Sequence, residues 1–128
     1  MTRRIAYTTV APEALKALSA IRPYLEATAI DARLRALVEL RVSQINGCAY
    51  CVDMHSREAR QAGETQQRLD CLVVWRETSF FNDRERAALA WAESVTLVSQ
   101  TGVPDAVYEQ ARQQFSEKDL VDLTSSCR

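Results

Sequence analysis

The sequence predicts an all-α fold, a single compact domain of about six or seven helices. Apolar residues recur at steps of three and four along most of the chain, as they do in helices that bury one face. Three glycines and three prolines interrupt 128 residues, and no stretch alternates apolar with polar residues as a strand would. A chain of this length that is 47% hydrophobic can bury one core, so we expect one domain over residues 1–128.

Two helices are predicted before the cysteine-containing segment. A short one covers residues 13–21 after Pro12 and ends before Pro23, since proline disfavours a helix that continues through it. A longer one follows Asp31, whose carboxylate can cap its first turn, and runs toward Asn46.

The longer helix has one apolar stripe, which predicts its buried face. At 100° per residue the stripe comprises Leu34, Leu37, Val38 and Ile45, while Arg35, Glu39 and Ser43 fall away from it. Arg41 lies inside the stripe. We expect its aliphatic stem to pack and its charged head to form an ion pair at the edge of the core.

The rest of the chain predicts further helices separated by capping residues. Asn46 and Gly47 end the preceding helix. The next helix is predicted to run from Cys48 to Gly63, a glycine that can cap its C-terminal end. The next helix follows Thr65. It contains Cys71, and its predicted inward face comprises Leu69, Leu72, Val73 and Trp75.

Three helices complete the prediction. Asn82 and Glu85 have the spacing of a capping box, and the helix that follows ends at Gly102; its inward stripe comprises Ala88, Trp91, Ala92, Val95 and Val98. A further helix covers residues 104–115. The last one is capped by Ser116.

Charge and hydropathy argue against nucleic-acid and membrane partners. Sixteen basic and seventeen acidic residues give a formal net charge of −1, which creates no field that would draw the chain to a polyanion. The first ten residues lack the apolar core of a signal peptide, and eighteen apolar residues never occur in succession. We therefore expect a cytoplasmic protein.

The residues that carry chemistry are Cys48, Cys51 and His55, the only histidine. On one helix they share a face, because residues three and four apart lie on successive turns. Two thiols one turn apart can cycle between dithiol and disulfide. The start of a helix favours a thiolate, and a thiol pKa of about 8.5 can fall to about 3.5–7.5 there. These features predict a redox-active dithiol.

The spacing also predicts a role for each group. His55, four residues after Cys51, can take the thiol proton or stabilise the thiolate. Cys51 is therefore the predicted attacking thiolate and Cys48 the resolving thiol. A hydroperoxide would oxidise Cys51 to a sulfenic acid, Cys48 would condense with it to a disulfide, and an external dithiol or protein reductant would reset the pair.

The cysteines have two other interpretations. Cys48, Cys51 and His55 could be three ligands of a zinc ion, but the sequence offers no obvious fourth, so we expect no metal and no organic cofactor. The pair could also be inert buried thiols, which their shared face with His55 argues against. Cys71 and Cys127 have no histidine nearby in sequence, and we expect both to be structural.

The stretch ELRVSQINGCAYCVDMHSREARQAG and the later ERAALAWAESVT resemble the alkylhydroperoxidase D-like branch of the carboxymuconolactone decarboxylase family. The similarity covers roughly residues 30 to 105, with its core motif at residues 36–63. It implies an all-helical fold that assembles as trimers or hexamers. It also implies peroxide reduction by Cys48 and Cys51 and a proton relay through a glutamate, a cysteine and His55.

Two positions depart from that pattern. The relay glutamate of the family falls at Ala36, and a histidine often found before the second cysteine is replaced by Tyr50. Glu39 lies within about 60° of the Ala36 position on the same helix and could reach the site through water. The alternative is an exposed surface carboxylate at Glu39.

Three functions follow as hypotheses. The first is a thiol-dependent peroxidase acting in antioxidant defence, with Cys51, Cys48, His55 and Glu39 as its site. The second is a decarboxylase or lactone-processing enzyme that uses His55 as acid or base. The third is a redox-sensing or scaffold subunit without catalysis.

Overall fold

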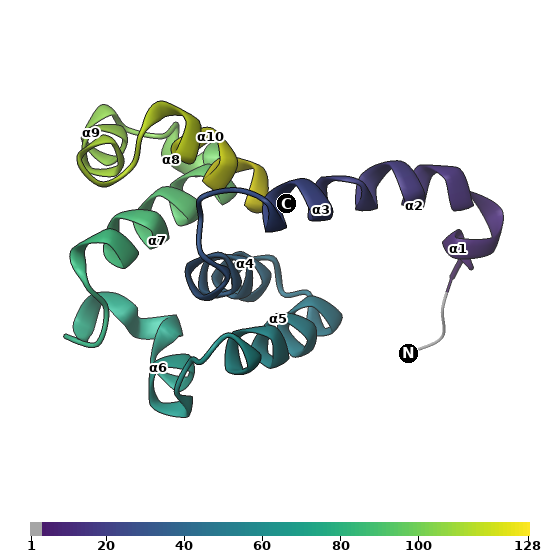
Figure 1. Ribbon diagram of the computed structural model, residues 1–128, viewed down its shortest axis with the longest axis horizontal. Helices are drawn as coiled ribbons and strands as arrows, with labels where there is room; N and C mark the ends of the chain where they lie inside the picture. Colours follow the sequence, from purple (N-terminus) through teal and green to yellow (C-terminus); the bar gives the residue numbers. More distant parts are fainter. Residues whose placement is uncertain (1–3) are drawn as a thin grey trace.

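The computed structural model describes residues 4–128, and within them every regular element is helical (Figure 1). The prediction of an all-α fold is confirmed. Six of the helices have eight residues or more, which agrees with the predicted six or seven. In chain order the elements are α1 (Tyr7–Val10), α2 (Pro12–Ser19), α3 (Ile21–Glu26), α4 (Ala32–Asn46), α5 (Ala49–Gln61), α6 (Gln66–Asp70), the 3₁₀-helix η1 (Leu72–Glu77), α7 (Asp83–Thr96), α8 (Val98–Thr101), α9 (Asp105–Gln114) and α10 (Glu117–Ser126).

Helix α4 lies at the centre of the body, with α5, α7 and α10 packed around it (Figure 1). It contributes to both clusters of the hydrophobic core, with Val38 in one and Leu37 in the other. Because α4 is covered on several sides, even its polar residues Glu39 and Ser43 are buried. The one-sided stripe predicted for this helix therefore described only part of its buried surface.

The capping residues read from the sequence act as predicted. Asp31 accepts a hydrogen bond from the Leu34 backbone at the start of α4, and Ser116 caps α10 in the same way. Asn82 and Glu85 form a full capping box at the start of α7. Gly47 ends α4 with a φ of 65°, a conformation that glycine adopts without steric cost. These caps fix where α4 ends and where the cysteine helix begins.

The first half of the chain differs from the prediction at Pro23. The predicted helix was to end before this residue, but α2 ends at Ser19 and a separate helix, α3, begins at Ile21 and includes Pro23 in its first turn. Proline is tolerated there because the first backbone N–H groups of a helix have no intrahelical partner. The short helix α1 was also not predicted.

The segment after Thr65 is also less regular than predicted. Instead of one helix it forms α6 and η1, with a non-helical backbone at Val74. Leu69, Leu72 and Trp75 are buried as expected, but Val73 is 57% exposed. The changed register after α6 turns Val73 outward and leaves Cys71 half-buried at the end of α6.

The inward stripe predicted for the helix after Asn82 is wrong at its last residue, Val98. Helix α7 ends at Thr96, and α8 begins at Val98 after a non-helical residue, so Val98 no longer continues the stripe and is 57% exposed. Ala88 and Ala92 are fully buried, whereas Trp91 and Val95 are half-buried.

The helices α1 and α2 project from the body as an N-terminal arm (Figure 1). Neither helix contains a buried residue. Apolar side chains along the arm remain exposed, including Ile5, Tyr7, Val10 and Leu18. Helix α3 joins the arm to the body, where Leu25 is buried and Tyr24 donates a hydrogen bond to Asp122 of α10. The compact part of the molecule therefore begins at α3. No helix in residues 4–128 is long and apolar enough to cross a membrane.

Arg41 confirms the expected ion pair at the edge of the core. Its Nε donates to Oε1 of the buried Glu93 at 2.8 Å, and the Trp75 indole donates to the same oxygen at 2.9 Å. Arg76 pairs with the other oxygen. Burial alone would raise the pKa of Glu93, but the hydrogen bonds from Arg76, Trp75 and Arg41 outweigh it and lower that pKa.

This network predicts a measurable loss of stability in Glu93→Gln. Two guanidinium groups would lose a carboxylate partner, and we expect the free energy of unfolding in urea at pH 7 to fall by about 2 kcal/mol. Because the folded pKa of Glu93 is lowered, its contribution is present above the ordinary carboxyl pKa and is lost as pH falls through the folded value. The free energies of unfolding of the wild type and of Glu93→Gln should therefore become equal in strong acid. The exposed Glu109→Gln serves as the control, and an equal loss in both variants would contradict the prediction.

Candidate active site

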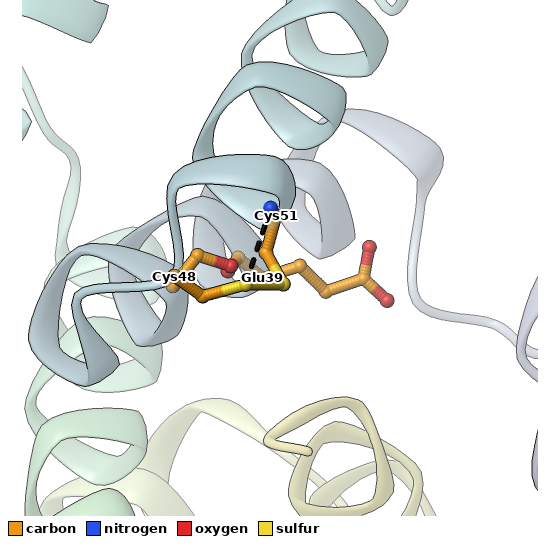
Figure 2. Close-up of a disulfide and its surroundings, with 4 residues drawn as sticks. Glu39, Cys48 and Cys51 are labelled. Carbon is orange, nitrogen blue, oxygen red and sulfur yellow. Dashed lines mark hydrogen bonds between the residues drawn. A yellow bond between two sulfur atoms is a disulfide. The ribbon is translucent and has the colours of Figure 1, made fainter. Parts of the chain in front are cut away.

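The two predicted redox cysteines are joined as a disulfide at the start of α5, with 5.3 Å between their Cα atoms. Cys48 is the N-cap residue of the helix, and its Sγ accepts a hydrogen bond from the Cys51 backbone N–H at 3.3 Å (Figure 2). Both residues are half-buried. The helix therefore places the pair where a sulfur receives a backbone N–H and the positive end of the helix dipole.

His55 lies one turn further along α5, and its side chain is only 13% exposed. The ring Nδ1 is 2.8 Å from Glu58 Oε2 and 3.4 Å from Glu39 Oε2. These two carboxylates come from different helices, α5 and α4. His55 thus joins the cysteine helix to the central helix through its Nδ1 side.

Glu39 is buried beneath this ring, with 9% of its surface exposed. Its carboxylate points away from the two sulfur atoms (Figure 2). Burial raises the pKa of Glu39, and the charges of His55 and Arg128 offset that effect only in part; Arg128 Nη1 is 3.8 Å from Glu39 Oε1. The surface-carboxylate alternative for Glu39 is therefore wrong, because neighbouring helices cover this side of α4.

Glu58 is the second carboxylate, and Arg22 of α3 holds it. Arg22 Nη2 donates to Glu58 Oε1 at 2.5 Å and leaves Oε2 to His55. Burial alone would raise the pKa of Glu58, but the hydrogen bonds from Arg22 and His55 outweigh it and lower that pKa. Two carboxylates that contact one ring nitrogen therefore have pKa values shifted in opposite directions.

A cavity of about 60 Å³ adjoins these carboxylates. Its lining includes Arg22, Arg35, Ala36, Glu39 and Glu58. A water molecule needs roughly 10–15 Å³ of such volume, so a few waters fit beside the carboxylates. The cavity provides a polar space next to Glu39 on the side away from the sulfurs.

The other two cysteines are free and half-buried, and they do not form a second disulfide. Burial and the negative charge of Glu39 raise the pKa of the Cys127 thiol to about 12, so this thiol stays protonated near neutral pH. Its Sγ donates to the Leu123 carbonyl at 3.4 Å. This environment is that of a structural cysteine.

Comparison with known proteins identifies the family. Residues 12–94 match the sequence model of the carboxymuconolactone decarboxylase family. The chain belongs to this family. It is 42% identical to the uncharacterized protein YdfG of Bacillus subtilis (strain 168), over 96% of this chain and 84% of that protein. It is 31% identical to the uncharacterized protein YnjA of Escherichia coli (strain K12), over 75% of this chain and 52% of that one.

A solved structure agrees with this family assignment and shows which fold the chain shares. A crystal structure from Agrobacterium tumefaciens superimposes with a TM-score of 0.94 at 40% identity, covering 98% of this chain and 86% of the other. It is described as a protein of unknown function with a suggested identity as the antioxidant defence protein AhpD. This carboxymuconolactone decarboxylase family member is therefore AhpD-like in fold.

Ala36 occupies the position where the sequence resemblance implies a relay glutamate, and Glu39 supplies a carboxyl nearby. Both residues line the cavity that Glu58 also lines. The small side chain of Ala36 leaves space where the family pattern has a glutamate, and Glu39 brings a carboxylate to the same ring from the next turn of α4. Tyr50, at the expected histidine position, is 74% exposed and contributes little to the buried site.

Two residues of the site were not predicted from the sequence of this family member. Glu58 lies three residues after His55 on α5, and that spacing alone places the two side chains on one face. Arg22 is 36 residues from Glu58. Only the packing of α3 against the body brings it to the site, so no local pattern could have predicted it.

Within residues 4–128, Glu39, His55 and Glu58 form a group that could hold a metal ion, since their ligand atoms lie within 4.8 Å of one another. This set differs from the zinc ligands considered from the sequence, whose two sulfurs are joined in a disulfide. In the arrangement present, Glu58 Oε2 is within hydrogen-bond distance of the His55 ring and Arg22 holds its other oxygen. The contacts present are therefore hydrogen bonds and ion pairs within the protein.

Proposed function

We propose that this protein is a thiol-dependent peroxidase that reduces hydroperoxides through Cys48 and Cys51. The observation that carries the proposal is the disulfide at the start of α5, one turn before a histidine that contacts two carboxylates. The antioxidant description of the similar crystal structure supports the same function. A dithiol at a helix N-terminus with a histidine beside it suits thiolate chemistry.

In the proposed cycle His55 takes the proton of the Cys51 thiol. The thiolate attacks the terminal oxygen of the hydroperoxide, and the O–O bond breaks to give Cys51 sulfenic acid and an alkoxide. His55 returns the proton to the alkoxide, which leaves as an alcohol. The Cys48 thiol then condenses with the sulfenic acid to form the disulfide and one water molecule.

An external dithiol or protein dithiol completes the cycle. Its thiolate attacks the Cys51 sulfur, and Cys48 leaves as a thiolate. The hydrogen bond from the Cys51 N–H to Cys48 Sγ stabilises that leaving group. A second thiol of the reductant then releases Cys51, so two thiols are oxidised for each disulfide that is reduced.

Glu39 has the properties of the relay carboxyl in this scheme. It is buried, it contacts the His55 ring, and it borders a cavity that can hold water. Glu39 can therefore exchange protons with the cavity waters.

We also propose that the protein forms a homo-oligomer, as the trimers or hexamers of the family imply. The N-terminal arm, made of α1 and α2, exposes apolar side chains that a neighbouring subunit could cover. Light scattering of the intact chain and of a Val10→Ser/Leu18→Ser variant would test this. We expect the variant to dissociate, and equal masses for the two proteins would contradict a role for the arm.

Intact mass spectrometry tests the proposed chemistry directly. The fully reduced protein is treated with one equivalent of an organic hydroperoxide, and we expect the loss of two hydrogen atoms, located by peptide mapping to Cys48 and Cys51. The matched control is Cys48→Ser/Cys51→Ser, which retains Cys71 and Cys127 and should not change in mass. A pair that stays fully reduced under excess hydroperoxide would exclude the peroxidase and favour a non-catalytic subunit.

A further inference from the structure

We propose that Glu58 and Arg22 are positioning residues that bind the Nδ1 proton of His55 and leave Nε2 as the basic atom of the ring. Glu39, whose nearest ring nitrogen is the same Nδ1 at 3.4 Å, then exchanges protons with the cavity waters and not with Nε2. This inference rests on the proposed function, because it assigns separate roles to the two carboxylates that contact the relay histidine.

The distances favour Glu58 as the partner of the Nδ1 proton. Nδ1 is 2.8 Å from Glu58 Oε2 and 3.4 Å from Glu39 Oε2, and only the shorter distance is that of a strong hydrogen bond. An ionised carboxylate can only accept a hydrogen bond, so the nitrogen that meets it must carry the proton. In a neutral imidazole the other nitrogen, Nε2, is then unprotonated and free to take a thiol proton.

Arg22 makes Glu58 suitable for this task. Its guanidinium binds Oε1 at 2.5 Å, the oxygen that His55 does not use, and so fixes the orientation of the carboxylate. Arg22 Nε also pairs with Glu26 Oε1 at 3.0 Å, but that pair is largely exposed and does not touch Glu58 or His55. The pair links α3 to α5, and Glu58 stays ionised because its pKa is lowered.

Glu39 is in the opposite situation. Its contacts with His55 and Arg128 are longer, at 3.4 and 3.8 Å, and burial raises its pKa. Two carboxyl groups whose environments push their pKa values apart commonly divide between a fixed charge and a proton carrier. Glu58 has the environment of the fixed charge and Glu39 that of the carrier.

The single histidine of the chain allows a direct test by nitrogen-15 NMR. With any purification tag removed, the Nδ1 and Nε2 signals arise from His55 alone. In the resting disulfide form above the titration of the ring, we expect the Nδ1–H tautomer in the wild type, in Glu39→Gln and in Glu26→Gln. In Glu58→Ala and Arg22→Gln we expect a shift toward Nε2–H, larger in Glu58→Ala.

Glu26→Gln is the matched control because it removes a partner of Arg22 while leaving the Glu58 contact in place. A wild-type ring in the Nε2–H form would overturn the proposal, as would an unchanged tautomer in Glu58→Ala. If Glu58→Ala does not fold, the same comparison is made with Glu58→Leu, which keeps much of the side-chain volume but has no hydrogen-bond acceptor. None of these spectra requires peroxide turnover, so this proposal and the proposed peroxidase can fail separately.

Kinetics provide the second readout. We expect hydroperoxide-dependent disulfide formation to slow about tenfold in Glu58→Ala, because the ring spends less time in the productive tautomer. Glu26→Gln should retain the wild-type rate. A tautomer shift without a change in rate would overturn the positioning role of Glu58.

Discussion

Peroxide consumption is expected to fall on the order of 10³-fold or more in Cys51→Ser, because the variant lacks the attacking thiolate. Cys51 is the cysteine one helical turn before His55, and serine at this position has a hydroxyl that remains protonated at neutral pH. The measurement is the disappearance of an organic hydroperoxide with a small dithiol as reductant. Full turnover in Cys51→Ser would contradict the proposed cycle.

Cys48→Ser should fail in a different way. Cys51 can still react once with the hydroperoxide, but without a resolving thiol it stops as the sulfenic acid. We expect a single turnover and a sulfenic acid that a dimedone probe traps at Cys51. If the probe instead traps a sulfenic acid at Cys48 in Cys51→Ser, then Cys48 is the attacking thiolate and Cys51 the resolving thiol. The dithiol cycle itself would stand.

Cys71→Ser and Cys127→Ser are the controls for both variants. Both thiols are free, and that of Cys127 has a raised pKa, so neither is placed to substitute for the redox pair. We expect turnover close to that of the wild type in each. If the cysteine variants at positions 48 and 51 are inactive while these two are active, the activity belongs to the dithiol.

The parts of the fold that follow local rules could be predicted from the sequence. The caps at Asp31, Asn82 and Ser116 depend on hydrogen bonds within one turn, and each is present. The dithiol and His55 could be placed on one face for the same reason, since their spacing lies within two turns of a single helix. Local geometry therefore sufficed for these caps and for placing the two cysteines and His55 on one helix.

The parts that depend on tertiary packing could not be predicted in this way. Glu39 looks like a surface residue on a helical wheel, and it is buried because α4 is covered by several neighbouring helices. Val73 has the right spacing for the core but lies beyond an irregular end of α6. Arg22 belongs to the site only because α3 packs against the body. In each case contacts between distant segments override the local pattern.

The burial of Glu39 connects the fold to the chemistry. An uncovered α4 would leave this carboxyl in solvent, with an ordinary pKa and no contact with His55. Its place beneath α5 raises its pKa, the direction that suits a carboxyl that both accepts and releases protons. The same burial has a cost in stability, because the ionised form loses hydration.

Glu39→Gln should therefore lose activity without losing stability. We expect hydroperoxide-dependent disulfide formation to slow about 10²-fold, since glutamine cannot carry the proton. If the ionised carboxylate is the proton acceptor, wild-type activity should decline as pH falls through the raised pKa of Glu39, and this decline should be absent from the residual activity of the variant. The pH profile thus separates proton transfer from simple packing.

The stability of Glu39→Gln is expected to match or exceed that of the wild type at pH 7. A carboxyl whose folded pKa is raised contributes stability below its unfolded pKa, and that contribution is lost as pH rises through the folded value. The uncharged amide avoids this loss. Urea unfolding at pH 7 and pH 4 measures the difference, which should be smaller at pH 4. A strongly destabilised variant would assign Glu39 a structural role instead.

Ala36 allows a rescue experiment in the same cavity. Ala36 and Glu39 line one cavity together with Glu58, so Ala36→Glu/Glu39→Gln returns a carboxyl from the previous turn of α4. We expect disulfide formation in this double variant to be at least about tenfold faster than in Glu39→Gln. The reason is that the relay needs a carboxyl near the ring rather than one at a particular position. Ala36→Gln/Glu39→Gln adds similar volume without the charge and should recover nothing. Equal rates in the two double variants would mean that the position does not transfer protons.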